Sequence, residues 1–217
     1  MSKLTLHGYW RSGTSYRTRI ALNLKGLDYA QVAHNLLKSE HKEASYTRLS
    51  PQGLVPALVV DGGPTLVQSP AILEWLEETY PDPPLLPRGA DDRAVVRAMC
   101  AVIGCDIHPL GNVRILKYLK SELDQEQEAI DAWSRNWIGQ GFAALEKMIG
   151  QYGAGHCFGD AITMVECYLV PQVYSARRVG TDLSPYTRLM AAYEAAIDNP
   201  AFAAAHPEKQ PDAVPVT

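Results

Sequence analysis

The chain contains 217 residues, enough for one large domain or two small ones around a hydrophobic core. Hydrophobic residues make up 47% of it and charged residues 20%, which is typical of a folded globular protein and argues against disorder. The formal net charge is -4 and the pI ≈ 5.9. This acidic balance argues against nucleic acid as a partner, but it allows a small anion bound by a few arginines.

The N-terminal stretch and the cysteines indicate the compartment. Residues 1–13 (MSKLTLHGYWRSG) lack the apolar core of a signal peptide and the length of a membrane span, so we expect a cytoplasmic protein that does not enter a membrane. The cysteines are Cys100, Cys105, Cys157 and Cys167. No CxxC or Cys/His ligand spacing connects them, which predicts free thiols and no metal site.

The first third of the chain alternates strand and helix patterns. The expected elements are strands at 3–9 and 29–34, helices at 16–25 and 41–49, strands at 57–60 and 65–68, and a helix at 69–80. Asp61-Gly62-Gly63 between two apolar runs is typical of a β-hairpin. Ser69 followed by Pro70 predicts a helix start with Ser69 as its cap. The predicted order is therefore β-α-β-α-β-β-α.

The rest of the chain is helical in pattern. The proline-rich run PDPPLLPRG predicts a break, so we place one domain at 1–83, a linker at 84–92 and an all-helical domain at 93–217. The expected helices lie at 93–119 and 126–152, with later ones from about 163 and 187. Pro109 predicts a kink or break in the first of them. The tail from His206 onward is expected to be surface coil.

Several segments together resemble the zeta class of cytosolic glutathione transferases. The matching segments are WRSGTSYRTRIAL at 10–22, LVPAL at 54–58, QSPAI at 68–72, IHPL at 107–110, and GD at 159–160 continuing to YLVPQV at 168–173. They cover nearly the whole chain and are specific in combination. The resemblance implies a thioredoxin-like N-terminal domain, an all-α C-terminal domain, glutathione as cofactor, a homodimer, and a substrate pocket between the domains.

The class includes glutathione-dependent isomerases of aromatic catabolism, and the RSGTS form is closer to those acting on maleylpyruvate. The implied activity is cis–trans isomerisation of a small 4-oxo-enoic diacid, either maleylacetoacetate to fumarylacetoacetate or maleylpyruvate to fumarylpyruvate. One alternative is a transferase that conjugates or dehalogenates small electrophiles. Another is a non-catalytic binding module, although a module has no need for a complete glutathione site.

Small hydroxyl residues lie between the first strand and the first helix. Unpaired backbone N–H groups and the positive end of the helix meet there, which favours an ionised thiol. By resemblance, Ser12, Gly13 and Thr14 bind glutathione, and Ser12 and Thr14 hold its thiolate, with Ser12 slightly favoured. Thr14 stands where the class usually has a cysteine. The alternative is that Ser15 only caps the helix.

Two further segments are assigned to glutathione by resemblance. Val55 and Pro56 are expected to join through a cis bond that presents the backbone of Val55 to the cysteinyl unit, whereas base rates for X-Pro bonds alone favour trans. Gln68 and Ser69 are expected to bind the γ-glutamyl end, because a helix N-terminus suits a carboxylate. Capping alone is the other interpretation of Ser69.

Arginines distinguish an isomerase of diacids from a general transferase. Arginine matches a carboxylate through two parallel hydrogen bonds. By resemblance, Arg11, Arg114 and Arg178 bind the substrate carboxylates, and Arg11 also assists catalysis beside the thiolate turn. Surface exposure is the ordinary interpretation of a lone arginine such as Arg178. The arginines assigned only structural roles are Arg17, Arg19 and Arg177.

Two more features complete the prediction. Gly111 stands where many zeta members have a glutamine that touches glutathione, so this contact is expected to be weaker, with Asn112 as a polar wall of the glutathione site. Thr163 and Glu166 form a capping-box pattern ahead of an apolar run, which we interpret as structural, as we do Asp160.

Overall fold

The computed structural model describes residues 3–214 and divides the chain into two compact units. The first comprises the residues up to Pro84 together with those from Asn199 onward, and the second spans Leu85–Asp198. The sequence placed a single boundary at 84–92, whereas in this division the last segment groups with the N-terminal unit. In residues 3–214, no helix combines the length and hydropathy needed to cross a membrane.

The first unit is built on a mixed four-stranded sheet. Its strands are β1 (Leu4–Gly8), β2 (Tyr29–Ala33), β3 (Ala57–Val60) and β4 (Thr65–Val67). The order is β2-β1-β3-β4, with β1 parallel to β2 and the other neighbours antiparallel. The predicted hairpin joins β3 to β4, and Gly62 has a φ of 72° that suits glycine. The predicted order of strands and helices is confirmed.

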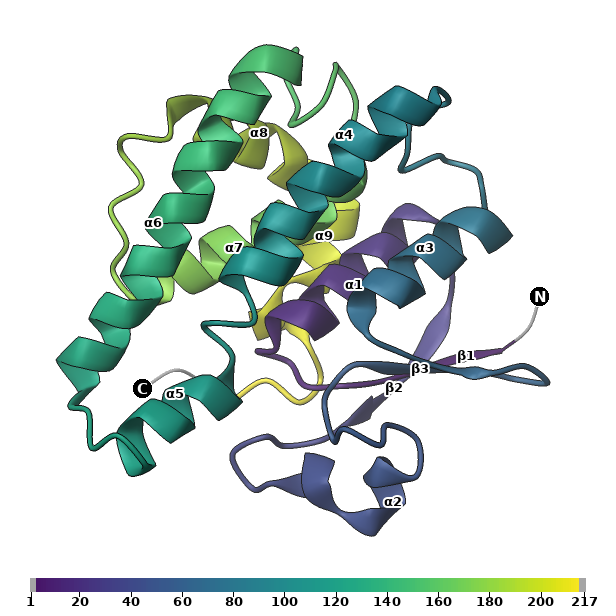
Figure 1. Cartoon of the computed structure of the whole chain (residues 1–217). Helices are drawn as coiled ribbons and strands as arrows, with labels where there is room; N and C mark the ends of the chain where they lie inside the picture. The colour runs from purple at the N-terminus through teal and green to yellow at the C-terminus, as the bar shows by residue number, and fades with distance from the viewer. Residues whose placement is uncertain (1–2, 215–217) are drawn as a thin grey trace. The chain divides into compact units, whose positions relative to one another are not determined.

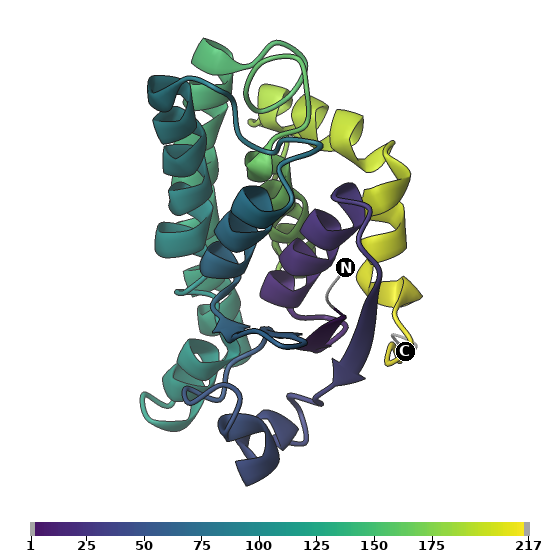
Figure 2. The ribbon, with the colours of Figure 1, turned by 90° about the vertical axis from the view of Figure 1, so that its right-hand side faces the viewer.

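Helices cover both faces of this sheet, α1 (Gly13–Leu24) and α3 (Ser69–Thr79) on one face and the short η1 (Glu40–Lys42) and α2 (Ala44–Thr47) on the other (Figures 1 and 2). Apolar side chains of α1 and α3, such as Ile20 and Leu76, are fully buried, and burial of each stabilises the fold by about 1.5–3 kcal/mol. A buried ion pair also joins the two helices, with Lys25 Nζ 2.6 Å from Glu77 Oε2 and 2.6 Å from the carbonyl oxygen of Pro83.

Two short helices end this unit, α9 (Pro200–Ala205) and η3 (Pro207–Lys209). Arg19 Nε on α1 donates to the carbonyl of Ala205 at 3.0 Å, and the backbone N–H of Trp10 donates to Asp212 Oδ2 at 2.9 Å. The expectation of a surface coil from His206 onward holds for most of the described tail, but η3 is helical, and Pro207 and Gln210 are buried. The segment is too short for periodic patterning, and it is fixed by hydrogen bonds to residues far away in sequence.

The second unit consists of helices. They are α4 (Ala90–Ala101), the π-helical η2 (Val102–Ile107), α5 (Val113–Ser121), α6 (Gln127–Tyr152), α7 (Met164–Arg178) and α8 (Thr187–Ile197). The expected helix at 93–119 is interrupted by the π turn and by the segment containing Pro109, which confirms the predicted break. A Cβ on Gly141 would lie 2.3 Å from Ile107 Cδ1, so α6 approaches η2 closely at this glycine.

Helix α7 is the buried element of this unit. The predicted capping box is present, because the Thr163 hydroxyl accepts from the backbone N–H of Val165 and the Glu166 carboxylate accepts from the backbone N–H of Thr163 at 2.8 Å. Glu166 is fully buried and also accepts from the backbone N–H of Cys157 at 2.7 Å. These hydrogen bonds fix the N-terminus of α7, whose apolar side chains lie in the core of the unit. This agrees with the structural role expected for Thr163 and Glu166.

Candidate functional site

The turn between β1 and α1 brings three hydroxyl groups together. Ser12 is the N-cap of α1, and its Oγ accepts from the backbone N–H of Ser15 at 3.3 Å. Ser15 is buried, and its own Oγ accepts from the backbone N–H of Tyr9. The alternative that Ser15 caps the helix is therefore wrong, because Ser12 does so.

The donors of this turn favour an anion. The first N–H groups of a helix have no intrahelical acceptor, and within residues 3–214 those of Gly13 and Thr14 have no other protein acceptor. The first turn of α1 carries no acidic side chain. The positive end of the helix is thus left uncompensated, as a bound thiolate requires.

Ser12 and Thr14 have different hydrogen-bond roles. The Thr14 hydroxyl donates to the carbonyl of Val55 at 2.9 Å, and Thr14 Oγ1 lies 3.0 Å from Ser12 Oγ. Because a hydroxyl carries one proton, Thr14 accepts in the second contact and Ser12 donates. The proton of Ser12 is thus held only by a neutral hydroxyl, and an anion forms a stronger bond. This geometry supports the preference for Ser12.

The Val55–Pro56 bond is cis, as expected from the resemblance. The preceding carbonyl, that of Leu54, accepts from Tyr46 Oη at 2.7 Å and from Ser50 Oγ at 2.9 Å. Burial raises the pKa of Tyr46 to about 12, so Tyr46 remains a donor. The loop is therefore fixed by side-chain hydroxyls, while the backbone N–H of Val55 has no acceptor within residues 3–214.

Two histidines lie next to Tyr46. His7 Nδ1 is 2.9 Å from His34 Nε2, and the His34 ring centroid is 4.2 Å from that of Tyr46. Burial lowers the pKa of both histidines, and in His7 the neighbouring His34 lowers it further. A hydrogen bond between two imidazoles needs one ring nitrogen without a proton, so the pair favours neutral histidine.

At the start of α3, Gln68 takes the cap position with a φ of 68°, and its Nε2 lies 2.5 Å from Gln52 Oε1. Ser69 is the first helical residue and is 2% exposed, and its Oγ accepts from Arg17 Nη1 at 3.1 Å. The prediction that Ser69 caps the helix is wrong, because the backbone turns at Gln68. The first turn of α3 also lacks acidic side chains.

Arg11 lies beside the thiolate turn. Its guanidinium carbon is 5.3 Å from the centroid of the Trp10 ring, and Trp10 is buried. No ion pair involves Arg11 in the described residues. Its position on a fixed aromatic ring leaves the charge available to a ligand.

In the second unit, Gly111, Asn112 and Arg114 are neighbours at the start of α5. The side-chain oxygen of Asn112 caps α5 by accepting from the backbone N–H of Arg114 at 3.1 Å. Arg114 is exposed. A Cβ on Gly111 would meet no atom within 4 Å, so a larger side chain would fit there.

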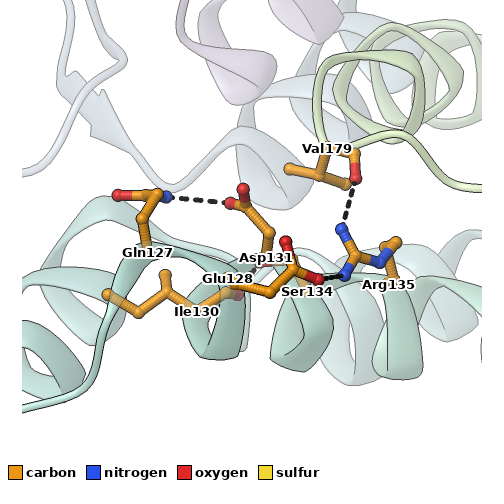
Figure 3. A network of polar contacts seen from close by, with 7 residues as sticks. All are labelled: Gln127, Glu128, Ile130, Asp131, Ser134, Arg135 and Val179. Atoms are coloured by element: carbon orange, nitrogen blue, oxygen red, sulfur yellow. Dashed lines mark hydrogen bonds and ion pairs between the residues drawn. The ribbon is translucent and has the colours of Figure 1, made fainter.

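Arg178 is the exposed last residue of α7. The preceding Arg177 packs 4.8 Å over the Tyr193 ring and donates to its hydroxyl, which fits the structural role expected of it. After α7, the carbonyl of Val179 accepts from Arg135 Nη1 at 3.1 Å, and Arg135 also pairs with Glu128 on α6 (Figure 3). Helix α6 thus fixes the backbone next to Arg178.

Comparison with known proteins bears on this geometry. The sequence profile described as "Glutathione S-transferase, N-terminal domain" matches residues 11–79. A maleylpyruvate isomerase from a Ralstonia species is 50% identical over 96% of this chain and 99% of its own length. A maleylacetoacetate isomerase from Pseudomonas aeruginosa is 47% identical over 96% of this chain and 98% of its own.

Solved structures agree. A holo maleylpyruvate isomerase, described as a bacterial zeta-class glutathione S-transferase, has a TM-score of 0.94 and 49% identity and covers 97% of this chain and 100% of its own. A maleylacetoacetate isomerase from Anaeromyxobacter dehalogenans with bound glutathione has a TM-score of 0.90 and 42% identity, covering 98% and 99%. The chain belongs to the zeta class of glutathione transferases, the family of the maleylpyruvate and maleylacetoacetate isomerases. The fold implied by the resemblance is confirmed.

Proposed function

We propose that the protein is a glutathione-dependent cis–trans isomerase of a small 4-oxo-enoic diacid, maleylpyruvate or maleylacetoacetate. The observation that carries the proposal is the turn at the start of α1. There the Ser12 hydroxyl lies beside the N–H groups of Gly13 and Thr14, which have no acceptor within residues 3–214, and the first turn of the helix has no acidic side chain. The relatives with these activities, 44–50% identical over nearly the whole chain, support it.

The donor set of the first unit fits glutathione. Ser12 and Thr14 lie where the thiolate would be held, Val55 offers a backbone N–H for the cysteinyl unit, and Ser69 with Gln68 offers the start of α3 for the γ-glutamyl carboxylate. When bound, glutathione supplies a thiolate whose reversible addition turns the substrate double bond into a rotatable single bond.

Side chains of the protein would stabilise the negative charge that this addition creates on the substrate. Negative charge develops toward the 4-oxo oxygen of the substrate, and fixed donors lower the barrier most where charge develops. We assign this role to Arg11, which is held against Trp10. Arg114 and Arg178 are assigned to the two substrate carboxylates, because a guanidinium matches a carboxylate in two parallel bonds. Asn112 is assigned to the polar wall of the glutathione site.

The test is an isomerisation assay of maleylpyruvate and maleylacetoacetate with and without glutathione. We expect turnover of at least one diacid with glutathione and none with the thoroughly dialysed protein, because no side chain of the turn is a thiol. Appreciable isomerisation without glutathione would contradict the mechanism. The ratio of kcat/KM for the two diacids would assign the native substrate.

A general transferase is the second candidate. The thiolate turn would equally activate glutathione for conjugation or dehalogenation of an electrophile. An Arabidopsis thaliana relative named glutathione S-transferase Z1 is 41% identical over 97% of this chain. Faster turnover of an aryl halide than of either diacid would favour this candidate, and retention on immobilised glutathione without any turnover would indicate a binding module.

We also propose that the chain forms a homodimer in the cytoplasm. The zeta-class resemblance supports the dimer, and the four free cysteines support a reducing compartment. Light scattering at micromolar concentration should give twice the chain mass of 23.9 kDa, and a mass of 23.9 kDa would contradict the dimer. Recovery of the protein with the periplasmic fraction would contradict the location.

A further inference from the structure

A buried arginine lies behind the proposed carboxylate site at the start of α3. Arg17 is on α1, one turn after the thiolate turn, and is 2% exposed. Its Nη1 donates to Ser69 Oγ at 3.1 Å, and Ser69 is itself 2% exposed. A buried positive charge thus lies next to the first residue of α3.

The hydrogen bond from Arg17 determines whether the Ser69 hydroxyl can donate to a ligand. A guanidinium is protonated at neutral pH and only donates hydrogen bonds. Ser69 Oγ therefore accepts from Arg17, and its single proton remains to be donated elsewhere. The N–H groups of Ser69 and Ala71 at the start of α3 have no intrahelical acceptor, and Pro70 has no N–H at all. Both the hydroxyl and the backbone are set to donate to one anion.

We propose that Arg17 is a positioning residue that fixes Ser69 as a donor and stabilises the γ-glutamyl carboxylate of glutathione by its buried charge. This inference rests on the glutathione site proposed above. It assigns the recognition of the carboxylate to a side chain that acts through Ser69. A purely structural role, tying α1 to α3, would stabilise the fold without affecting which peptide binds.

Arg19 provides a matched control. It lies two residues further along α1 and is 1% exposed, and among the described residues it donates only to backbone carbonyls, those of Ala205 and Trp10. Burial lowers its pKa to about 10. Replacement of Arg19 removes an equally buried guanidinium from the same helix, but it leaves the hydrogen bond between Arg17 and Ser69 in place.

The experiment compares two peptides by calorimetric titration. One is glutathione, and the other is 4-aminobutanoyl-cysteinylglycine, which lacks only the α-carboxylate of the glutamyl unit. In Arg17→Gln, affinity for glutathione should fall about ten- to a hundredfold, the range for loss of a charge-assisted hydrogen bond. Affinity for the shorter peptide should change less than about threefold, which is less than the loss of one charge-assisted hydrogen bond would cause. Arg17→Lys should recover part of the loss. At saturating glutathione, kcat should be retained.

Several outcomes would overturn the proposal. Equal losses on both peptides, or the same selective loss in Arg19→Gln, would mean that Arg17 only supports the fold. If Arg17→Gln does not fold, Arg17→Lys and Ser69→Ala form a double-mutant cycle, in which Arg17→Lys should no longer affect peptide preference once Ser69 is alanine. If the wild-type protein prefers glutathione to the shorter peptide but isomerises neither diacid, the result would contradict the proposed function. It would not contradict the role of Arg17.

Discussion

The first unit buries three of its basic side chains, whereas the second exposes both of its arginines that are assigned to substrate. Arg17, Arg19 and Lys25 are 6% exposed or less and are held by hydrogen bonds. Arg114 and Arg178 are exposed. Fixed donors cost little to organise when a ligand binds, while exposed arginines must lose rotamer freedom. The proposed cofactor site is therefore built into the fold, and the proposed substrate contacts depend on side chains at the surface.

The largest effect is expected at the ion pair between Lys25 and Glu77. Glu77→Gln leaves the Lys25 ammonium buried, and loss of one partner of a buried pair costs about 3–5 kcal/mol of unfolding free energy. The matched change is Glu128→Gln, because the Glu128–Arg135 pair is 81% and 31% exposed and such pairs contribute about 0–1 kcal/mol. Urea unfolding measures the free energy of unfolding of both variants. Equal losses would show that the buried pair of the first unit contributes no more than the exposed pair of the second.

The next effect concerns the thiolate turn. Ser12→Ala should reduce kcat/KM for isomerisation by about 10- to 1,000-fold, as for loss of an oxyanion-type donor, and should raise the pKa of bound glutathione. Thr14→Ala should reduce it less, because the Thr14 proton is used by the carbonyl of Val55. Steady-state kinetics and the ultraviolet absorbance of the thiolate test this, and a silent Ser12→Ala beside a severe Thr14→Ala would reverse the order.

Changes at the arginines assigned to the substrate should be smaller and selective. Alanine at Arg11, Arg114 or Arg178 should lower kcat/KM for the diacid about ten- to a hundredfold, since a charge-assisted hydrogen bond contributes about 1.5–3 kcal/mol. Lysine should rescue only part of this. A neutral aryl halide is the control substrate and should hardly respond. Equal losses of kcat/KM on both substrates would mean that these arginines support the fold or the glutathione site instead.

A gain is expected at Gly111. The position is exposed and has open space for a side chain, so Gly111→Gln should fold normally. If the glutamine restores the contact implied by the class, glutathione should bind about two- to tenfold more tightly, the value of one neutral hydrogen bond. Gly111→Ala is the control for the backbone effect. Unchanged affinity in Gly111→Gln would show that this chain does not lack the contact.

The smallest effect is a dependence of stability on pH. Because the pKa values of His7 and His34 are lowered in the folded protein, the unfolded chain binds more protons between those values and about 6.5. Unfolding free energy should therefore fall as pH decreases below about 6.5. His7→Gln should flatten the profile in that range, leaving the parts due to His34 and His206, whose pKa values burial also lowers. An unaltered profile would exclude His7 as a source of the dependence.

Local patterns predicted the elements, and the resemblance predicted the cis bond at Pro56. The roles of Ser69 and Arg17 could not be predicted in this way. A serine before a proline fits an N-cap, but the left-handed backbone of Gln68 moves the cap back by one residue. Arg17 contacts a residue 52 positions away, and no local signal marks such a bond. The sequence predicts only a structural role for Arg17, because patterning does not show which group a buried guanidinium contacts.

The hydrogen bond between α9 and α1 also affects the order in which the two units fold during synthesis. Arg19 and Trp10 obtain the hydrogen-bond partners supplied by Ala205 and Asp212 only after all of 85–198 has been translated. Domains generally fold as units while the chain emerges from the ribosome, and buried polar groups need their partners. The helical unit is therefore continuous and can close first, whereas the unit begun first is completed last.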